Sequence, residues 1–222
     1  MVTLTPSTVA TDRSPSPGLR RTEVALLVGA PVVLAVGRLT LIPYDDQKWD
    51  HMLGQMAAHH SRNAFGWGLA LVAAALLVAS GLALVRLVPG RPGLTVPALV
   101  GVALGWVGTA GVATGGLVMG DMADSPDRRA MVDVLTNFNE GNGNVIFVLI
   151  VAGVLGNVLL ASALRRSGIA SRGTVVVISV GAVLSLTGAP GPAIAIAVSG
   201  AVLMLVGHLL LLRGMAQAPS GS

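Results

Sequence analysis

The sequence predicts an all-α protein, a bundle of six transmembrane helices, and three observations lead to this prediction. The chain of 222 residues is 53% hydrophobic and only 11% charged, whereas soluble domains carry roughly 25% charged residues. Stretches of about twenty mainly apolar residues recur along the chain, and each could cross a hydrocarbon core of roughly 30 Å. The arginines gather in alternate connections between these stretches. A multi-pass membrane protein is therefore expected.

The apolar stretches place the helices at about 23–42, 64–88, 96–120, 143–164, 173–189 and 192–212. Residues 1–22, rich in Ser, Thr and Pro, are expected to form a disordered cytoplasmic tail. The transmembrane domain then covers 23–213, and a second disordered cytoplasmic tail covers 214–222. The last two helices meet at a Gly-Ala-Pro-Gly-Pro turn, residues 188–192. One long kinked helix is the alternative there, but the apolar run is about twice one membrane thickness.

The connecting segments alternate in charge. Arginines occupy the N-terminal tail, the second and fourth connections and the C-terminal end: Arg13, Arg20, Arg21, Arg86, Arg91, Arg165, Arg166, Arg172 and Arg213. The first and third connections collect acids: Asp45, Asp46, Asp50, Asp121, Asp124, Asp127, Asp133 and Glu140. Short arginine-rich loops stay in the cytoplasm, so both termini are predicted to be cytoplasmic in a cell (plasma) membrane protein. No continuous basic face exists, which excludes nucleic acid as a partner.

A shift of 79 residues aligns one part of the chain with another without gaps. Matching residues coincide: Asp45 with Asp124, Asn63 with Asn142 and Arg86 with Arg165. The shift predicts a parallel repeat of two helical hairpins, 22–88 and 101–167, followed by a third hairpin. In each copy the acidic segment has apolar residues at helical spacing. Both segments, 48–61 and the stretch after Ser125-Pro126, are expected to be short amphipathic helices in the outer membrane interface.

The first acidic segment contains the main candidates for catalysis. His51, His59 and His60, together with Asp50 and Glu140, could act as acid, base or ligand groups. His51 and His59 lie about 80° apart around a helix, and no metal-binding signature surrounds them. No metal and no cofactor are therefore predicted. Solvated interfacial histidines without a chemical role are the simpler alternative.

The candidates for ligand binding are Arg38, Asn139, Asn142 and Asp121. Arg38 is the single charge within an otherwise apolar helix. It is expected to snorkel to the outer surface or to pair with Asp121 or Glu140, and it is the first choice for holding an anionic head group. The run NFNEGNGN, residues 137–144, would present its amides to the histidines of the first copy. A helix cap followed by a turn is the simpler interpretation of this run.

Two further polar residues lie inside predicted helices. Asn157 and His208 have a similar depth near the cytoplasmic side, and a hydrogen bond between their helices is expected. A proton or substrate contact is the alternative. The third helix carries small-xxx-small pairs, which allow close helix approach: Gly101 with Gly105, Gly111 with Gly115, and Gly116 with Gly120.

These features leave several classes of function open. The preferred class is an accessory, immunity or complex-forming membrane subunit. The alternative is a membrane-embedded enzyme acting on a lipid or isoprenoid at the extracytoplasmic interface, and a small transporter comes third. Terpene-cyclase-type chemistry comes last, because it uses aromatic faces to stabilise cations and only 3% of the chain is aromatic. The expected partners are the bilayer, a lipid or isoprenoid ligand, and a membrane-protein partner or second copy.

One structural criterion separates the first two classes. An enzyme should gather its outer polar residues into one cavity, whereas an accessory subunit should leave them scattered. The hairpin layout and the connection Arg165-Arg166-Ser167-Gly168 resemble uncharacterised six-span integral membrane proteins of high-GC, actinobacterial-type bacteria. The resemblance implies the same six-span fold. It includes no motif specific to an activity, so it transfers no functional residue.

Overall fold

The computed structural model describes residues 19–41, 48–187 and 194–217, without the side chains of 138–143 and 187. All regular structure in this part is helical: α1 (Arg21–Thr40), α2 (Trp49–Ala58), α3 (His60–Arg86), α4 (Pro92–Ala123), α5 (Arg128–Arg166), α6 (Arg172–Thr187) and α7 (Ile194–Gln217). Five segments are long and apolar enough to cross a membrane, namely α1, α3, α4, α7 and the part of α5 from Asn144. The all-α prediction is confirmed, and the composition is that of a membrane protein.

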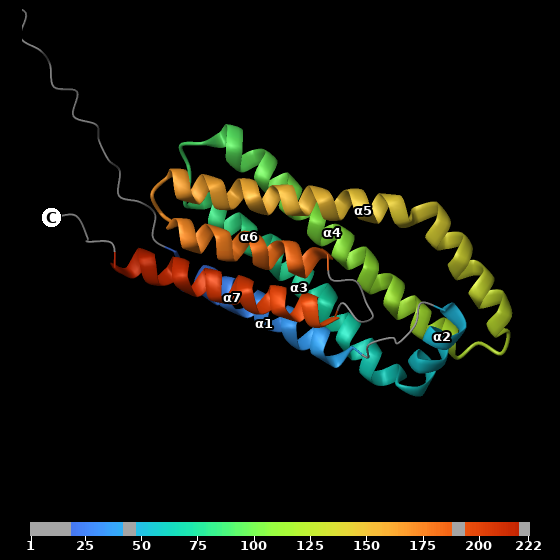
Figure 1. Ribbon diagram of the computed structural model, residues 1–222. Helices are drawn as coiled ribbons and strands as arrows, with labels where there is room; N and C mark the ends of the chain where they lie inside the picture. Colours follow the sequence, from blue (N-terminus) through green and yellow to red (C-terminus); the bar gives the residue numbers. More distant parts are fainter. Residues whose placement is uncertain (1–18, 42–47, 188–193, 218–222) are drawn as a thin grey trace, which may run out of the picture.

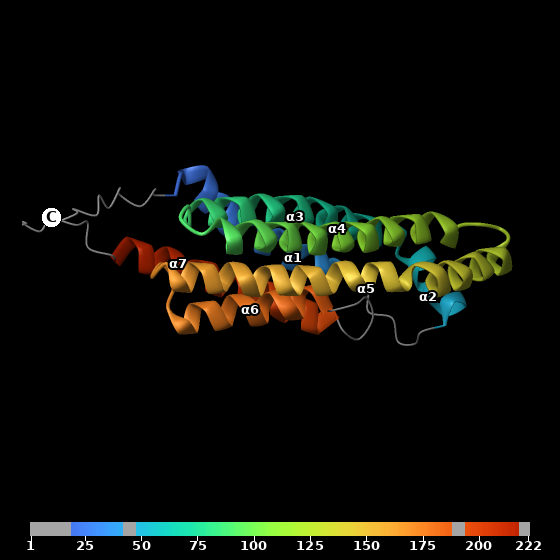
Figure 2. The same ribbon diagram turned by 90° about the horizontal axis from the view of Figure 1, so that it is seen from above.

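Six of these helices form a closed bundle. Each packs on its neighbours along the chain, from α1 and α3 through α4, α5 and α6 to α7, and α7 returns to α1. The six run roughly along one axis, and α1 begins at the end where α7 finishes (Figures 1 and 2). The short α2 packs across α4, α5 and the start of α3 at the opposite end. Sequential antiparallel packing follows from the short connections between the helices.

The two ends of the bundle differ in charge. One end, called here the arginine-rich end, holds Arg20, Arg86, Arg91 and Arg166, and Arg91 Nη2 donates a hydrogen bond to the Arg166 carbonyl at 3.0 Å. The other, the acidic end, holds α2 with Asp50 and the α4–α5 connection with Asp124 and Asp127. The predicted turn at 188–192, the acids at 45 and 46, and most of both predicted tails lie outside the described residues.

Helices α4 and α5 touch backbone to backbone in the arginine-rich half. A Cβ atom built on Gly101 would lie 2.7 Å from the Cα of Gly156. One built on Gly105 would overlap Gly153. Such contacts tolerate only glycine on both helices, so the close approach predicted from the first small-xxx-small pair is confirmed.

A proline in α1 explains where His208 binds. Pro31 has no N–H, so the Leu27 carbonyl four residues earlier has no donor within α1. His208 Nδ1, on α7, lies 2.8 Å from that carbonyl oxygen. The carbonyl can only accept, so Nδ1 carries the proton, and this bond ties the first helix to the last. The neighbouring helix thus satisfies the backbone group that Pro31 leaves free.

The predicted Asn157–His208 pair is wrong. Asn157 is buried, but its amide donates to the Gly153 carbonyl of its own helix at 2.9 Å. Helices α5 and α7 are not neighbours in the described bundle. Similar depth along the membrane normal did not reveal that the two residues lie on separate sides of the bundle.

The second acidic segment differs from its prediction as well. Residues 128–166 form one continuous helix of 39 residues, in place of a short interfacial helix, a turn at 137–144 and a span. At 1.5 Å per residue this helix is about 58 Å long, and it bends in its N-terminal half (Figure 1). Its N-cap is Asp127, whose Oδ1 accepts a hydrogen bond from Ala130 N at 3.1 Å. The two glycines at 141 and 143 cost about 1 kcal/mol each, and no proline interrupts the helix.

Candidate functional site

A cavity of about 580 Å³ lies at the acidic end between α4 and α5, and α2 covers part of it. Its walls are almost entirely apolar, with Trp49, Met52 and Met56 from α2, Trp67 from α3, and Met119 and Met122 among those from α4. Val118 and Val134 at its rim are about half exposed, at 48% and 47%. The volume falls in the range of pockets that hold small molecules, roughly 300–1,000 Å³. We refer to this cavity as the acidic-end pocket.

The glycines of α4 explain why the pocket exists. A Cβ on Gly108 would lie 2.9 Å from the Leu149 Cβ, so α4 and α5 still touch there. About one and two turns further along α4, a Cβ on Gly111 or Gly115 would meet nothing within 4 Å. The prediction that this second glycine pair marks close packing is therefore wrong. The helices have separated, and the missing side chains leave the space empty.

Helix α2 is held over this gap by its apolar face and by one arginine. Leu53 and Met56 are buried and belong to an apolar cluster with Leu135 of α5. Arg128 Nε lies 2.8 Å from Asp50 Oδ1, and Arg128 Nη2 donates to the Asp50 carbonyl at 2.9 Å. The amphipathic helix predicted at 48–61 is present as Trp49–Ala58. Its polar edge meets the first turn of α5.

The histidines of the same region form separate small contacts. His60 Nδ1 lies 3.3 Å from Asp124 Oδ2. His51 Nε2 lies 3.5 Å from the Gln55 amide nitrogen. His59 is exposed at the junction of α2 and α3. None of the three lines the acidic-end pocket. Within the described part of the chain, no three His, Cys, Asp or Glu side chains are placed to hold a metal ion.

The remaining ligand candidates do not join these contacts. Asp121 is exposed on α4. The side chains of Asn139, Glu140 and Asn142 lie outside the described residues, although their backbone is helical. The described catalytic candidates are thus distributed over several surface positions, and no acid–base pair among them lines the acidic-end pocket.

Arg38 is buried, contrary to the expectation that it snorkels. The residue is 4% exposed, and its guanidinium carbon lies 5.8 Å from the centre of the Trp67 ring. Among the described residues, Arg38 Nε and Nη1 have no hydrogen-bond partner, and neither has Trp67 Nε1. The expected pair with Asp121 is not formed. The same Trp67 ring lines the acidic-end pocket, so a single aromatic side chain contacts both the buried cation and the pocket.

The residues that matter most for this pocket are not evident from the sequence pattern. The pair Gly111 and Gly115 predicts helix packing, and no role is predicted for the methionines of α4. The signal available was four methionines in two pairs, Met52 with Met56 and Met119 with Met122. Flexible, polarisable methionine side chains suit irregular apolar ligands.

No protein-family model, no curated protein and no solved structure matches this chain.

Proposed function

We propose that the protein is a non-enzymatic membrane subunit that holds the apolar chain of a lipid or isoprenoid in the acidic-end pocket. The observation that carries this proposal is the pocket itself, about 580 Å³ in volume and lined by methionine, tryptophan and glycine. An apolar chain gains about 0.8 kcal/mol for each buried methylene group. Binding of such a chain therefore needs no polar group in the walls.

The arrangement of the polar residues supports binding without chemistry. His60 with Asp124 and Asp50 with Arg128 are separate pairs at the surface. A catalytic acid or base must reach its substrate within hydrogen-bond distance, and none of these four residues lines the pocket. The scattered arrangement favours the accessory class over the enzyme acting on the same kind of lipid.

The proposal includes six membrane spans with both termini in the cytoplasm. Five segments satisfy the length and hydropathy required of a span. The sixth, α6, is a shorter apolar helix that packs along α7 and α5. Short arginine-rich loops stay in the cytoplasm, so the arginine-rich end would face inward. The acidic-end pocket would then lie near the extracytoplasmic interface of the cell membrane.

The proposed repeat is supported by helix boundaries. A shift of 79 residues carries Trp49, where α2 begins, onto Arg128, where α5 begins. The same shift carries Arg86, the last residue of α3, to within one residue of the end of α5. On this proposal α5 is the uninterrupted counterpart of α2 and α3 together.

Two matched glycine substitutions test lipid binding. Gly115→Leu places a side chain in the pocket, and Gly68→Leu places the same side chain on α3. A Cβ at either position meets nothing within 4 Å, so both variants should fold equally well. Full-length protein is purified in mild detergent, and the lipids that remain bound are quantified by mass spectrometry. Gly115→Leu is expected to retain about tenfold less of the bound lipid, since filling the pocket displaces two or more methylene groups.

The control decides the interpretation. Gly68→Leu should retain the same lipid at the wild-type level. Equal retention by wild type and both variants, with unchanged melting temperatures, would contradict binding in the acidic-end pocket.

A further inference from the structure

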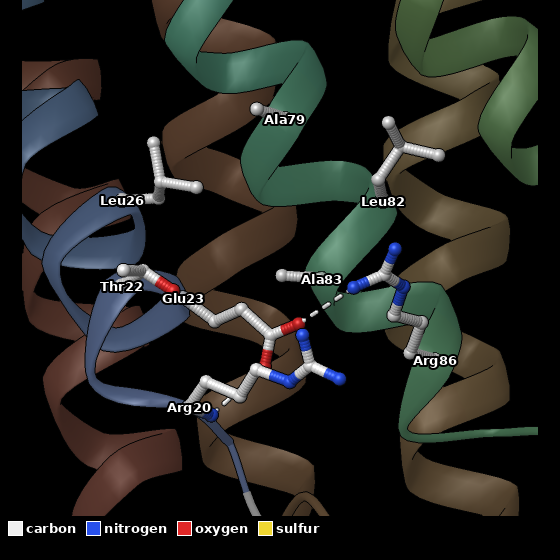
Figure 3. Close-up of a pocket in the computed structure, with 8 residues that line it drawn as sticks. All are labelled: Arg20, Thr22, Glu23, Leu26, Ala79, Leu82, Ala83 and Arg86. Carbon is white, nitrogen blue, oxygen red and sulfur yellow. Dashed lines mark hydrogen bonds and ion pairs between the residues drawn. The ribbon is translucent and has the colours of Figure 1, made fainter.

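A second cavity, of about 240 Å³, lies at the other end of the molecule between α1 and α3. Figure 3 shows its two parts. Arg20, Glu23 and Arg86 gather toward the arginine-rich end, while Leu26, Ala79 and Leu82 line the part deeper in the bundle. One end of this groove is therefore charged and the other is apolar.

Glu23 organises the charged part of the groove. Its Oε2 accepts from the Arg20 backbone N–H at 2.9 Å, and its Oε1 lies 2.9 Å from Arg86 Nη1. The Glu23 side chain is 12% exposed, whereas that of Arg86 is 68% exposed. A guanidinium has five N–H donors, and among the described residues Arg86 bonds through Nη1 alone. Glu23 thus fixes Arg86 at the mouth of the groove and leaves most of its donors unused.

The charge at the mouth is positive despite Glu23. Two arginines, Arg20 and Arg86, line the groove together with this single carboxylate. Arginine donors match phosphate oxygens in geometry and charge. On the side of the groove away from Arg20, two alanines of α3, Ala79 and Ala83, form a slot beside the bulkier Leu26 and Leu82.

We propose that this groove binds one anionic phospholipid of the leaflet at the arginine-rich end. The phosphate contacts Arg20 and Arg86, and the upper part of one acyl chain lies in the alanine slot. Basic pockets between helices on the cytoplasmic side bind anionic head groups by the same combination of charge and helix contact. This site is independent of the acidic-end pocket, which lies between other helices at the opposite end and has apolar walls.

The first test compares lipids on the full-length protein. Delipidated protein in detergent is titrated with phosphatidylglycerol, or with phosphatidylcholine of the same acyl chains, and native mass spectrometry reports bound lipid. Phosphatidylglycerol is expected to give one tightly bound copy that phosphatidylcholine does not give. Equal retention of both lipids would overturn the proposal. So would displacement of phosphatidylglycerol by millimolar inorganic phosphate alone, because the site would then recognise a free anion.

The second test removes the charges of Arg20, Glu23 and Arg86 together, so that the partly buried Glu23 carboxylate is not left without its arginine partner. The triple variant Arg20→Gln, Glu23→Gln, Arg86→Gln lowers the net charge by one. Arg165→Gln, at the position that the 79-residue shift equates with Arg86, makes the same change. The triple variant is expected to bind phosphatidylglycerol at least about fivefold more weakly than wild type. The control, Arg165→Gln, is expected to bind it with wild-type affinity. Equally weakened phosphatidylglycerol binding in both variants would indicate that the lipid responds only to the general surface charge, and it would overturn the proposed site.

A third test keeps every charge and blocks the slot. Ala79→Leu fills the groove, and Ala75→Leu adds the same side chain at an exposed position one turn away on α3. Ala79→Leu should reduce retention of phosphatidylglycerol at unchanged melting temperature, whereas Ala75→Leu should not. Full retention by Ala79→Leu would contradict the placement of the acyl chain.

Discussion

The hairpins α1–α3 and α4–α5 are closed at opposite ends. In the first, a Cβ on Gly37 would lie 3.1 Å from the Gly66 carbonyl oxygen, toward the acidic end. In the second, the contacts of Gly101 and Gly105 with α5 lie in the arginine-rich half. Each hairpin has a cavity at its other end, about 240 Å³ between α1 and α3 and about 580 Å³ beside α4 and α5.

The proposed repeat, with its shift of 79 residues, offers a physical reason for this difference. A close contact needs glycine on both helices. Gly37 corresponds to Gly116, but Gly66 corresponds to Val145, so the second hairpin cannot close at the acidic end. The glycines of the second contact correspond to larger residues in the first hairpin: Gly105 to Leu26 and Gly153 to Ala74. On this alignment, each hairpin opens into a cavity at the end where it lacks a glycine of the matching contact.

The largest effect is expected from Gly105→Leu, which would force the second hairpin apart at its closed end. The new side chain would overlap the backbone of Gly153, and overpacking of this kind costs about 3 kcal/mol or more. The melting temperature in detergent measures the loss. Gly111→Leu, on the same helix and facing open space, should cost nothing. Similar destabilisation by Gly105→Leu and Gly111→Leu would contradict the distinction between the closed and the open end of this hairpin.

Arg38→Met tests the closed end of the first hairpin. Arg38 follows Gly37, is buried, and has two nitrogens without a partner among the described residues. Even a buried ion pair can often be replaced by apolar side chains with no loss, or with a gain of about 1–4 kcal/mol, and a buried charge without a partner is less favourable still. We expect the free energy of unfolding to rise by about 2 kcal/mol, measured by denaturant titration in micelles. Arg213→Met, at an exposed position near the end of α7, serves as the control. A loss of stability in Arg38→Met would show that this charge is paired.

His208→Leu tests what joins α1 to α7. Losing the bond to the Leu27 carbonyl should cost about 1–2 kcal/mol, seen as a lower melting temperature. In a Pro31→Ala background, the backbone regains an N–H at position 31 that can donate to that carbonyl, so the same substitution should cost less. The double-mutant cycle measures this coupling directly. Equal costs in both backgrounds would mean that His208 acts through packing alone.

Arg128→Gln should have the smallest effect on stability. The pair with Asp50 is substantially exposed, and such pairs contribute about 0.5 kcal/mol or less. The consequence should be local, with faster hydrogen exchange in α2 because this helix loses a tether to α5. Arg129→Gln, at the exposed neighbouring position, should leave the exchange unchanged. Identical exchange in both variants would show that Leu53 and Met56 hold α2 without help.

The helices could be predicted from the sequence because membrane spans depend on length and hydropathy alone. The first helix was expected at 23–42 and runs from Arg21 to Thr40. The site could not be predicted in the same way, because glycine has opposite consequences in neighbouring turns. Gly105 brings α4 against α5, and Gly115 leaves a space. Only the position of the partner helix distinguishes the two cases, and no local pattern encodes it.

The polar residues illustrate a second limit. Depth along the membrane follows from residue counting, which correctly placed His208 inside the bundle and toward the arginine-rich end. Its partner depended on which helices are neighbours, and on the carbonyl that Pro31 leaves without a donor. Both Pro31 and His208 are visible in the sequence, and the four-residue offset of the free carbonyl follows from helix geometry. That the two residues meet could not be predicted, because it depends on α7 packing against α1 when the bundle closes.

The most direct measurement of the central claim is photolabelling of the acidic-end pocket. The purified protein is incubated with a lipid that carries a diazirine in its acyl chain, so that this lipid exchanges with the bound one. Unbound lipid is washed away before illumination. The labelled residues are then mapped by peptide mass spectrometry. The account predicts labels on Met52, Met119 and Met122, which line the pocket, and their loss in Gly115→Leu but not in Gly68→Leu. Labels confined to exposed lipid-facing residues such as Val107 and Phe147, unchanged in Gly115→Leu, would contradict it.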